Sequence, residues 1–119
     1  SPIRAVVDSI VAAPAADHPV PVLARRSALS ERHLARLFAE HTGTTPGRFV
    51  ERVRVEAARG LLESGGLSVD VVARHSGFGS AETMRRAFLR VLGVSPAEYR
   101  RRFATTQTTA AIQPERSAA

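Results

Sequence analysis

An internal repeat constrains the fold of this chain more than any other feature of its sequence. Three residues of the first half, Ala24, Arg25 and Ser27, recur 49 positions later as Ala73, Arg74 and Ser76. Five more recur 50 positions later, so that Ser30, Arg36, Phe38, Gly43 and Pro46 correspond to Ser80, Arg86, Phe88, Gly93 and Pro96. The extra residue falls in the turn between Ala28 and Ser30, where the second copy has Gly77-Phe78-Gly79. Such a repeat predicts two copies of one structural unit.

Each copy has the pattern of a helix-turn-helix. In the second copy a short apolar helix runs into Gly77, a tight turn follows, and Ser80 is placed to cap the next helix. In the first copy Ser30 has the capping position, and the helix that it opens extends over residues 31–41 with Leu34, Leu37 and Phe38 as its buried stripe. The chain is therefore predicted to be a duplicated two-helix unit.

Helical patterns also fill most of the remaining chain. Residues 3–11 carry apolar side chains at positions 3, 6, 7, 10 and 11, the spacing of an amphipathic helix. Three prolines predict a loop over residues 12–21, followed by a short helix over about residues 20–27. Thr45-Pro46 opens a long helix to about Ser64. We expect this helix to have one apolar stripe and one solvated side, the stripe consisting of Phe49, Val50, Val53, Ala57 and Leu61 and the solvated side of Arg52, Arg59 and Glu63.

Three more helices are expected in the second half. Ser68 caps a short helix, and the helix after Ser80 should bury four apolar side chains, Met84, Ala87, Phe88 and Val91. Ser95-Pro96-Ala97-Glu98 has the pattern of a capping box and opens a last helix through about Phe103. The predicted fold is all-α, with seven helices in two homeodomain-like helix-turn-helix subdomains. We place the first subdomain at residues 1–45, the linker helix at 46–64, the second subdomain at 65–104 and a flexible tail without periodicity at 105–119.

The charge of the chain favours a polyanionic partner. The net charge is +6, and all 17 basic residues are arginine, whose planar guanidinium suits phosphates and guanine edges. The alternative is that arginine replaces lysine through genomic composition and only solvates the surface. The absence of cysteine excludes disulfides and thiolate metal sites. Neither a membrane-spanning run nor a signal peptide is evident, so we expect a cytoplasmic, nucleoid-associated protein, and the start at Ser1-Pro2 suggests a fragment of a longer one.

Two helix-turn-helix units joined by one helix predict how DNA is bound. The second helix of each unit would lie in a major groove, and successive major grooves on one face of a duplex are about 34 Å apart. A linker of about 19 residues is only about 28 Å long. We therefore expect the protein to bend its DNA, at a cost of about 1 to 6 kcal/mol.

Helix phase selects the side chains that face the bases. The expected base-reading residues are Arg32, Ala35 and Arg36 in the first unit and Ala81, Glu82, Thr83, Arg85 and Arg86 in the second. Each of Arg32 and Arg36 could fork onto a guanine, while Glu82 could accept from a cytosine amine and Ala81 could touch a thymine methyl. The capping ends, with Ser30, His33 and Ser80, are expected near phosphates. The alternative for Arg36 and Arg86 is intrahelical pairing with Glu40 and Glu82.

The sequence resembles the AraC/XylS family of bacterial transcription regulators over about residues 22–103. The most specific motifs are Ser76 through Phe88 and the run from Gly93 to Phe103. The resemblance implies a seven-helix DNA-binding domain that activates or represses transcription, with double-stranded DNA and RNA polymerase as partners. It places the family's base-reading positions on Arg32, Ala35, Arg36, Ala81, Glu82, Thr83 and Arg86. Two of these are alanine where many relatives have a polar side chain, so direct reading is expected to be thinner there.

The resemblance also implies a sensing or dimerisation domain outside these 119 residues. Residues 42–50, Thr-Gly-Thr-Thr-Pro-Gly-Arg-Phe-Val, look like the subgroup fused to a DJ-1/PfpI-like domain.

Three other functional classes fit the sequence less well. An enzyme is not expected, because the four histidines lack metal-ligand spacing and no phosphate loop or nucleophile elbow is present, and no cofactor is predicted. A helical protein-interaction module would expose apolar faces, whereas the two reading helices expose arginine. RNA binding would need a stacking platform, and the five phenylalanines are largely assigned to cores.

Overall fold

The computed structural model describes residues 1–104, and all regular structure within them is helical. The six complete helices are α1 (Pro2–Ala12), α2 (Val20–Arg26), α3 (Glu31–Thr42), α4 (Pro46–Ser64), α5 (Val69–His75) and α6 (Ala81–Leu92). A seventh helix covers residues 96–104, up to the end of the described part. The predicted all-α fold with seven helices is confirmed. The expected tail, residues 105–119, lies outside the described residues.

Helix boundaries are set by the capping residues that the sequence suggested. The hydroxyl of Ser30 accepts a hydrogen bond from the backbone N–H of His33 at 3.0 Å, and Thr45, Ser68, Ser80 and Ser95 cap their helices in the same way. Such caps satisfy N–H groups that have no partner within the helix. The recognition-type helices α3 and α6 both end at a glycine in the left-handed conformation, Gly43 and Gly93, each with φ of 78°. The two repeat units therefore share both ends of their second helix.

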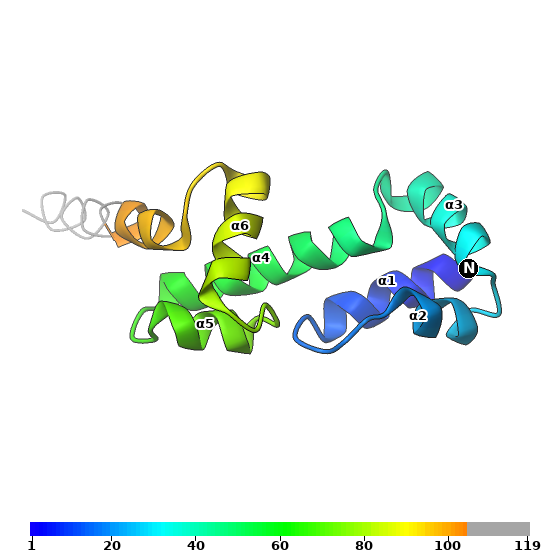
Figure 1. Ribbon diagram of the computed structural model, residues 1–119, viewed down its shortest axis with the longest axis horizontal. Helices are drawn as coiled ribbons and strands as arrows, with labels where there is room; N and C mark the ends of the chain where they lie inside the picture. Colours follow the sequence, from blue (N-terminus) through cyan, green and yellow to red (C-terminus); the bar gives the residue numbers. More distant parts are fainter. Residues whose placement is uncertain (105–119) are drawn as a thin grey trace, which may run out of the picture.

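Two separate hydrophobic cores lie at opposite ends of α4 (Figure 1). The first core packs α1, α2 and α3 against the start of α4, and its buried residues are Ile3, Val6, Ile10, Leu23, Ala24, Leu34, Phe38 and Val50. The second packs α5 and α6 against the later part of α4, and its buried residues are Val55, Ala58, Leu62, Val72, Ala73, Met84, Ala87 and Phe88. Each helix-turn-helix unit thus has a core of its own, and α4 serves both.

The apolar stripe expected on α4 is only part of its buried surface. Phe49, Val50 and Val53 of that stripe pack in the first core and Leu61 at the edge of the second. The fully buried residues of the second core, Val55, Ala58 and Leu62, lie outside the expected stripe. A helix that packs against two bodies uses two faces, and the change occurs between Val50 and Val55. Amphipathic periodicity assumes one buried face, so it cannot anticipate this change.

Two expectations about exposure also need correction. Val91, expected in the core, is 36% exposed, because Met84, Ala87 and Phe88 already fill the buried face of α6. Arg59 and Glu63, expected to be solvated, both bond to Tyr99 of the last helix. Arg59 donates to the phenolic oxygen at 3.1 Å, and the Tyr99 hydroxyl donates to Glu63. These contacts hold the last helix against α4.

The repeat is preserved in the packing of aromatic rings. Phe38 meets Phe49 edge to face with 5.5 Å between ring centroids, and Phe88 meets Tyr99 in the same way at 6.2 Å. Both pairs connect the second helix of a unit to the helix that follows it. The last helix is therefore the structural counterpart of the start of α4.

Candidate nucleic-acid interface

The exposed face of α3 is opposite the core. Leu34 and Phe38 are fully buried, which turns Arg32, Ala35 and Arg36 to solvent. Leu37, predicted to be buried with them, is only partly buried at the edge of the core. The structure therefore brings the three predicted base-reading residues of the first unit together on one accessible surface.

An ion pair within α3 engages Arg36. Its guanidinium lies 3.4 Å from the carboxylate of Glu40, one helical turn later. Both side chains are more than half exposed, so the pair is weak and open to exchange with another anion. The alternative that the sequence left open for Arg36, intrahelical pairing, is thus the geometry observed.

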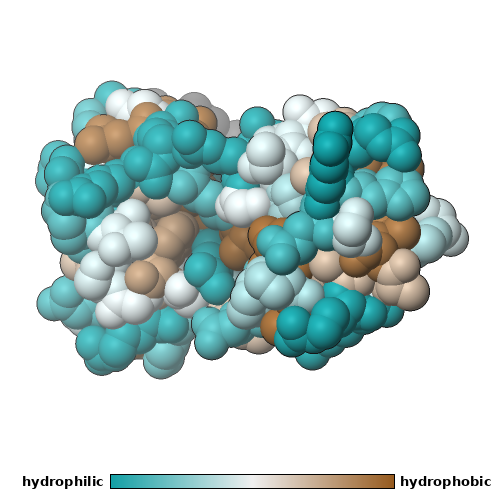
Figure 2. All heavy atoms as spheres, turned by 45° about the vertical axis from the view of Figure 1, so that its right-hand side comes forward, coloured by the Kyte–Doolittle hydropathy of each residue, from teal (hydrophilic) through white to brown (hydrophobic). Residues whose placement is uncertain are grey.

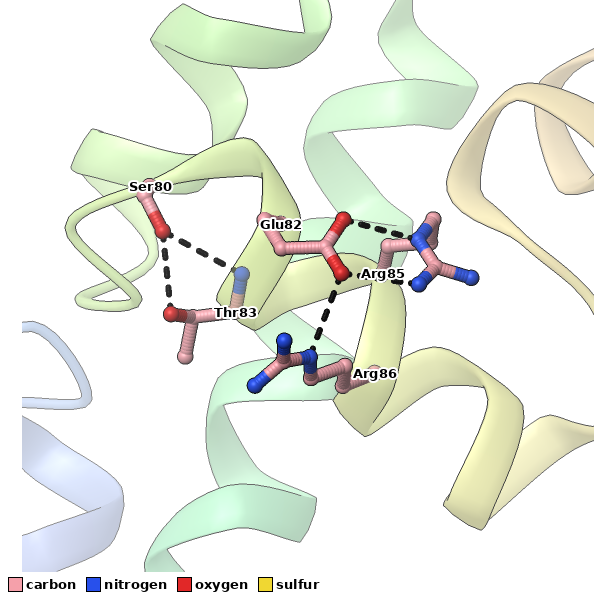
Figure 3. A network of polar contacts seen from close by, with 5 residues as sticks. All are labelled: Ser80, Glu82, Thr83, Arg85 and Arg86. Carbon is pink, nitrogen blue, oxygen red and sulfur yellow. Dashed lines mark hydrogen bonds and ion pairs between the residues drawn. The ribbon is translucent and has the colours of Figure 1, made fainter.

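Glu82 organises the corresponding surface of α6 (Figure 3). Its two carboxylate oxygens accept hydrogen bonds from Arg85 at 2.8 and 2.9 Å, and one of them also accepts from Arg86 at 3.1 Å. These bonds, chiefly those from Arg85, lower the pKa of Glu82 to about 2. A cytosine amine would have to share an oxygen already bonded to arginine.

Arg85 and Arg86 approach Glu82 from different sides (Figure 3). Arg85 lines a hollow between the starts of α5 and α6 and the last helix, together with Val69, Ala81, Glu82, Ser95, Pro96 and Ala97. Arg86 lies below the carboxylate in the same view and does not line this hollow. The two arginines, predicted together as base readers, therefore point in different directions from one anchor.

The capping ends of α3 and α6 are built alike. The Ser80 hydroxyl accepts from the backbone N–H of Thr83 at 3.2 Å and donates to the Thr83 hydroxyl at 2.9 Å. Ser30 and Ser80 are exposed, whereas His33 and Ala81 are partly buried. The hydrogen bond between the two hydroxyls holds the Thr83 side chain beside Ser80. Aligned backbone N–H groups give both helix starts a positive potential that favours phosphate.

Sequence reasoning missed several residues of the framework behind this surface. Arg90 of α6 donates to Glu51 of α4 at 2.6 Å, and this bond, the largest of several contributions, lowers the pKa of the Glu51 carboxyl. A charged pair separated by 39 positions gives no periodic signal. Figure 2 shows hydrophilic side chains projecting around recessed apolar patches on the face that it displays.

Two serine-capped helices that expose arginine, carried on one long helix, define a tandem helix-turn-helix domain. The family model described as a helix-turn-helix domain matches residues 23–102, and two relatives, of Streptomyces lividans and Streptomyces antibioticus, carry the name "Putative AraC-like transcription regulator". The chain belongs to this AraC-type helix-turn-helix family of transcription regulators.

Two curated relatives show how far the similarity extends. HTH-type transcriptional regulator Rv1931c of Mycobacterium tuberculosis is 51% identical over 87 residues, which are 73% of this chain and 34% of that protein. HTH-type transcriptional regulator GlxA of Rhizobium meliloti is 39% identical over 80 residues, which are 67% of this chain and 25% of that protein. The chain therefore matches between 25% and 34% of the length of these relatives.

Solved structures share the fold. The DNA-binding domain of the global transcriptional factor AdpA, in complex with a target DNA, has a TM-score of 0.85 and 35% identity, covering 91% of this chain and 97% of that one. The C-terminal domain of AraT, a response regulator from Geobacillus stearothermophilus, has a TM-score of 0.78 and 26% identity, covering 84% of each chain.

The described residues also bear on two other kinds of site. Within residues 1–104, no group of three histidine, aspartate or glutamate side chains is arranged to hold a metal ion. No helix in the same part of the chain is both long and apolar enough to cross a bilayer.

Proposed function

We propose that this chain is the DNA-binding part of a bacterial transcription regulator and recognises a specific duplex sequence with α3 and α6 in successive major grooves. The observation that carries the proposal is the pair of equivalent, capped, arginine-bearing helices at opposite ends of α4 (Figure 1). Family membership supports it, as does the structural likeness to the AdpA domain bound to its target DNA. Because the exposed residues of α3 and α6 differ, the two halves of the site should differ in sequence.

Direct base reading is assigned to the exposed first turns of the two helices. In α3 these residues are Arg32, Ala35 and Arg36, and in α6 they are Ala81, Glu82, Thr83 and Arg86. Arg85 bonds both carboxylate oxygens of Glu82 on the side of the last helix, so we assign it to the DNA backbone beside α6. Ser30, His33 and Ser80 mark helix starts that would lie near phosphates.

The ion pairs on both helices suggest how binding and specificity are linked. Arg36 and Arg86 each have a carboxylate partner in their own helix, at 3.4 and 3.1 Å. The edge of a guanine presents two hydrogen-bond acceptors in the arrangement that a guanidinium requires, whereas the other bases present fewer matching acceptors. An arginine therefore leaves its carboxylate for DNA only where its bonds to the DNA site are more favourable than the ion pair that it gives up.

Several finer features belong to the same proposal. The length of α4, about 28 Å against a groove spacing of about 34 Å, favours DNA that bends toward the protein. A sensing or dimerisation domain elsewhere in the full protein, contact with RNA polymerase and a cytoplasmic location all suit a transcription regulator. The small share of its relatives that the chain covers supports the further domain.

The proposal is tested by selecting bound sequences from random duplexes and then measuring affinities by fluorescence anisotropy at several salt concentrations. The protein should enrich one asymmetric sequence, and Arg36→Ala and Arg86→Ala should each lose about 1 to 3 kcal/mol of discrimination at one half of it. Equal affinity for all duplexes with a steep salt dependence would contradict sequence-specific reading.

Arg4→Ala is a suitable control for the charge change. Arg4 is a strongly exposed arginine on α1 and pairs with Asp8 at 3.7 Å in the same i, i+4 geometry as Arg36 and Glu40. Its loss should weaken binding equally for all sequences, if at all. Unchanged sequence preference in both reading-helix variants would refute the residue assignment.

A helical protein-interaction module is the weaker alternative. In residues 1–104 the strongly exposed large apolar side chains are Val11, Leu89 and Val91, at 55%, 42% and 36% exposure. Val11 is on α1 and the other two are on α6, so they do not form one continuous apolar stripe.

A further inference from the structure

The two helix-turn-helix units meet near the middle of α4. Arg54, which lies between the last residue of the first core and the first residue of the second, reaches back to the loop between α1 and α2. Its Nε donates to the carbonyl of Pro14 at 2.9 Å, and a terminal nitrogen donates to the carbonyl of Ala16 at 2.9 Å. One guanidinium thus fastens a loop of the first unit to the shared helix.

The turn of the second helix-turn-helix completes this junction. A Cβ atom on Gly77 would lie 2.8 Å from the Cα of Ala15, 2.8 Å from Nε of Arg54 and 2.9 Å from the carbonyl oxygen of Pro14. Two of these three atoms belong to the backbone of the first unit. Figure 1 shows the same proximity, with the loop after α1 beside the turn between α5 and α6. The two units therefore touch through a position that admits no side chain.

Comparison of the two repeats shows whether glycine at position 77 is required by the conformation of the turn or by the neighbouring loop. The position equivalent to Gly77 in the first unit is Ala28, which has φ of 57° and is exposed. The same turn therefore accepts a Cβ where no neighbour approaches. Gly79, with φ of 80°, also has a left-handed backbone, and a Cβ there would meet nothing within 4 Å. What distinguishes Gly77 is the loop of the first unit.

The loop that Arg54 holds has a defined shape. The ring Nε2 of His18 lies 2.8 Å from the carbonyl oxygen of Ala13, and the N–H of Ala16 donates to the same carbonyl at 3.2 Å. A loop closed on itself in this way can transmit a contact to the helices at its ends. Those helices are α1 and α2, which support α3.

We propose that Arg54 and Gly77 are positioning residues that set the placement of α6 relative to α3, and through it the spacing between the two halves of the DNA site. The inference rests on the proposed function. A tilt of about 15° acting over the part of α4 beyond Arg54, about 15 Å long, displaces its far end by about 4 Å, more than the roughly 3.4 Å rise of one base pair. A small change at this junction therefore puts one reading helix out of step with its bases.

The test compares Gly77→Ala with Gly79→Ala on duplexes that carry the selected site with its halves at the original spacing or moved by one base pair in either direction. Both substitutions place alanine at a left-handed position, but only the first pushes against the other unit. We expect Gly77→Ala to lose at least about tenfold in affinity for the original spacing and to keep affinity for each isolated half-site, because linkage between two sites is sensitive to geometry. Gly79→Ala should keep the original optimum.

Arg54→Lys provides a second variant in case Gly77→Ala does not fold, as judged by circular dichroism. Lysine keeps the charge but lacks the rigid planar fork, so it cannot hold the two carbonyls in the fixed geometry that Nε and the terminal nitrogen of Arg54 give. It should broaden the spacing preference without altering the bases preferred in either half. The inference is overturned if both variants keep the wild-type spacing optimum and affinity, or if Gly79→Ala shifts the optimum as much as Gly77→Ala. Wild-type protein that prefers no sequence would instead refute the proposed function.

Discussion

At the scale of single residues, equivalent positions of the two repeats face different demands. Ala28 is the one residue other than glycine in the described part of the chain with positive φ, while its counterpart Gly77 has φ of 95°. A left-handed backbone costs an L-residue about 1 to 2 kcal/mol. The first unit bears this strain, and the second removes it because it must also exclude a Cβ.

Ala28→Gly should therefore stabilise the protein. Relief of the left-handed strain exceeds the extra entropy of glycine in the unfolded chain, so we expect a gain of about 0.5 to 1 kcal/mol in the free energy of unfolding, measured by urea denaturation. Ala39→Gly, at an exposed position inside α3, is the matched control and should cost about 1 kcal/mol. Destabilisation by Ala28→Gly would show that φ at this position carries no strain.

The ionisation of Glu82 is a second residue-scale prediction. Its pKa is lowered from the usual 4.5 to about 2, so the carboxylate and its two ion pairs persist as the pH falls and are lost only near pH 2. The stabilisation from these ion pairs is thus fully present above the usual pKa of 4.5 and is lost as the pH falls through the pKa of Glu82 in the folded protein. Carboxyl NMR shifts followed from pH 6 to pH 1.5 should show this midpoint.

Arg85→Gln should move that midpoint up more than Arg86→Gln does, because bonding to Arg85 is the largest cause of the shift. A wild-type midpoint above pH 4 would mean that the observed pairs do not persist in solution.

At the scale of elements, the last helix depends on one aromatic residue. Tyr99 packs edge to face on Phe88, its hydroxyl donates to Glu63, and the guanidinium carbon of Arg59 lies 5.3 Å from its ring centroid. The helix over residues 96–104 is thereby attached to both α6 and α4. Because α6 carries the second reading surface, the last helix acts as a brace behind it.

Titration of Tyr99 measures this attachment directly, since the chain contains a single tyrosine. Burial, followed by the bond to Glu63, raises the pKa of its phenol above the usual 10.0. The unfolded chain then loses the proton at a lower pH than the folded protein does, so stability should fall as the pH rises above 10.

Ultraviolet absorbance during alkaline titration should give a midpoint above 10 for the folded protein. The same titration in guanidinium at a concentration that unfolds the protein, above about 5 M, should give a lower midpoint. Glu63→Gln removes a contact that favours the neutral phenol and should lower the folded midpoint. Identical midpoints in the folded and denatured states would contradict the described packing of the last helix.

At the scale of the whole molecule, two cores are joined by one helix and by the junction at Arg54 and Gly77. No buried residue belongs to both cores as they are described. Each unit should therefore open separately, with α4 and the junction as the coupling between them. The division at residues 1–45, 46–64 and 65–104 stays a prediction, although α4 contributes buried residues to both neighbours.

A matched pair of core substitutions tests this independence. Phe38→Ala and Phe88→Ala remove equivalent, fully buried rings, each at a cost of about 3 to 5 kcal/mol. Hydrogen exchange should show lost amide protection in α1 to α3 for the first variant and in α5 and α6 for the second. Uniform loss of protection in both variants would mean that the two units fold as one cooperative body.

The sequence by itself determined the elements and their order. Serine caps, proline positions and glycine stops are local signals, and the internal repeat showed that two units share one architecture. Helix phase alone turned Arg32 and Arg36 away from Leu34 and Phe38, because side chains on one helix have a fixed angular relation. The exposed candidates for reading DNA therefore needed no tertiary information.

Only the tertiary structure decided how the two units share α4 and how they touch. The change of buried face between Val50 and Val55, the bond from Arg54 to the loop after α1 and the closeness of Gly77 to Ala15 all join residues distant in sequence. Periodicity describes one helix against one core, and it carries no information about which residues of separate elements meet. The relative placement of the reading helices is set by such contacts, so it could be described only once the chain was folded.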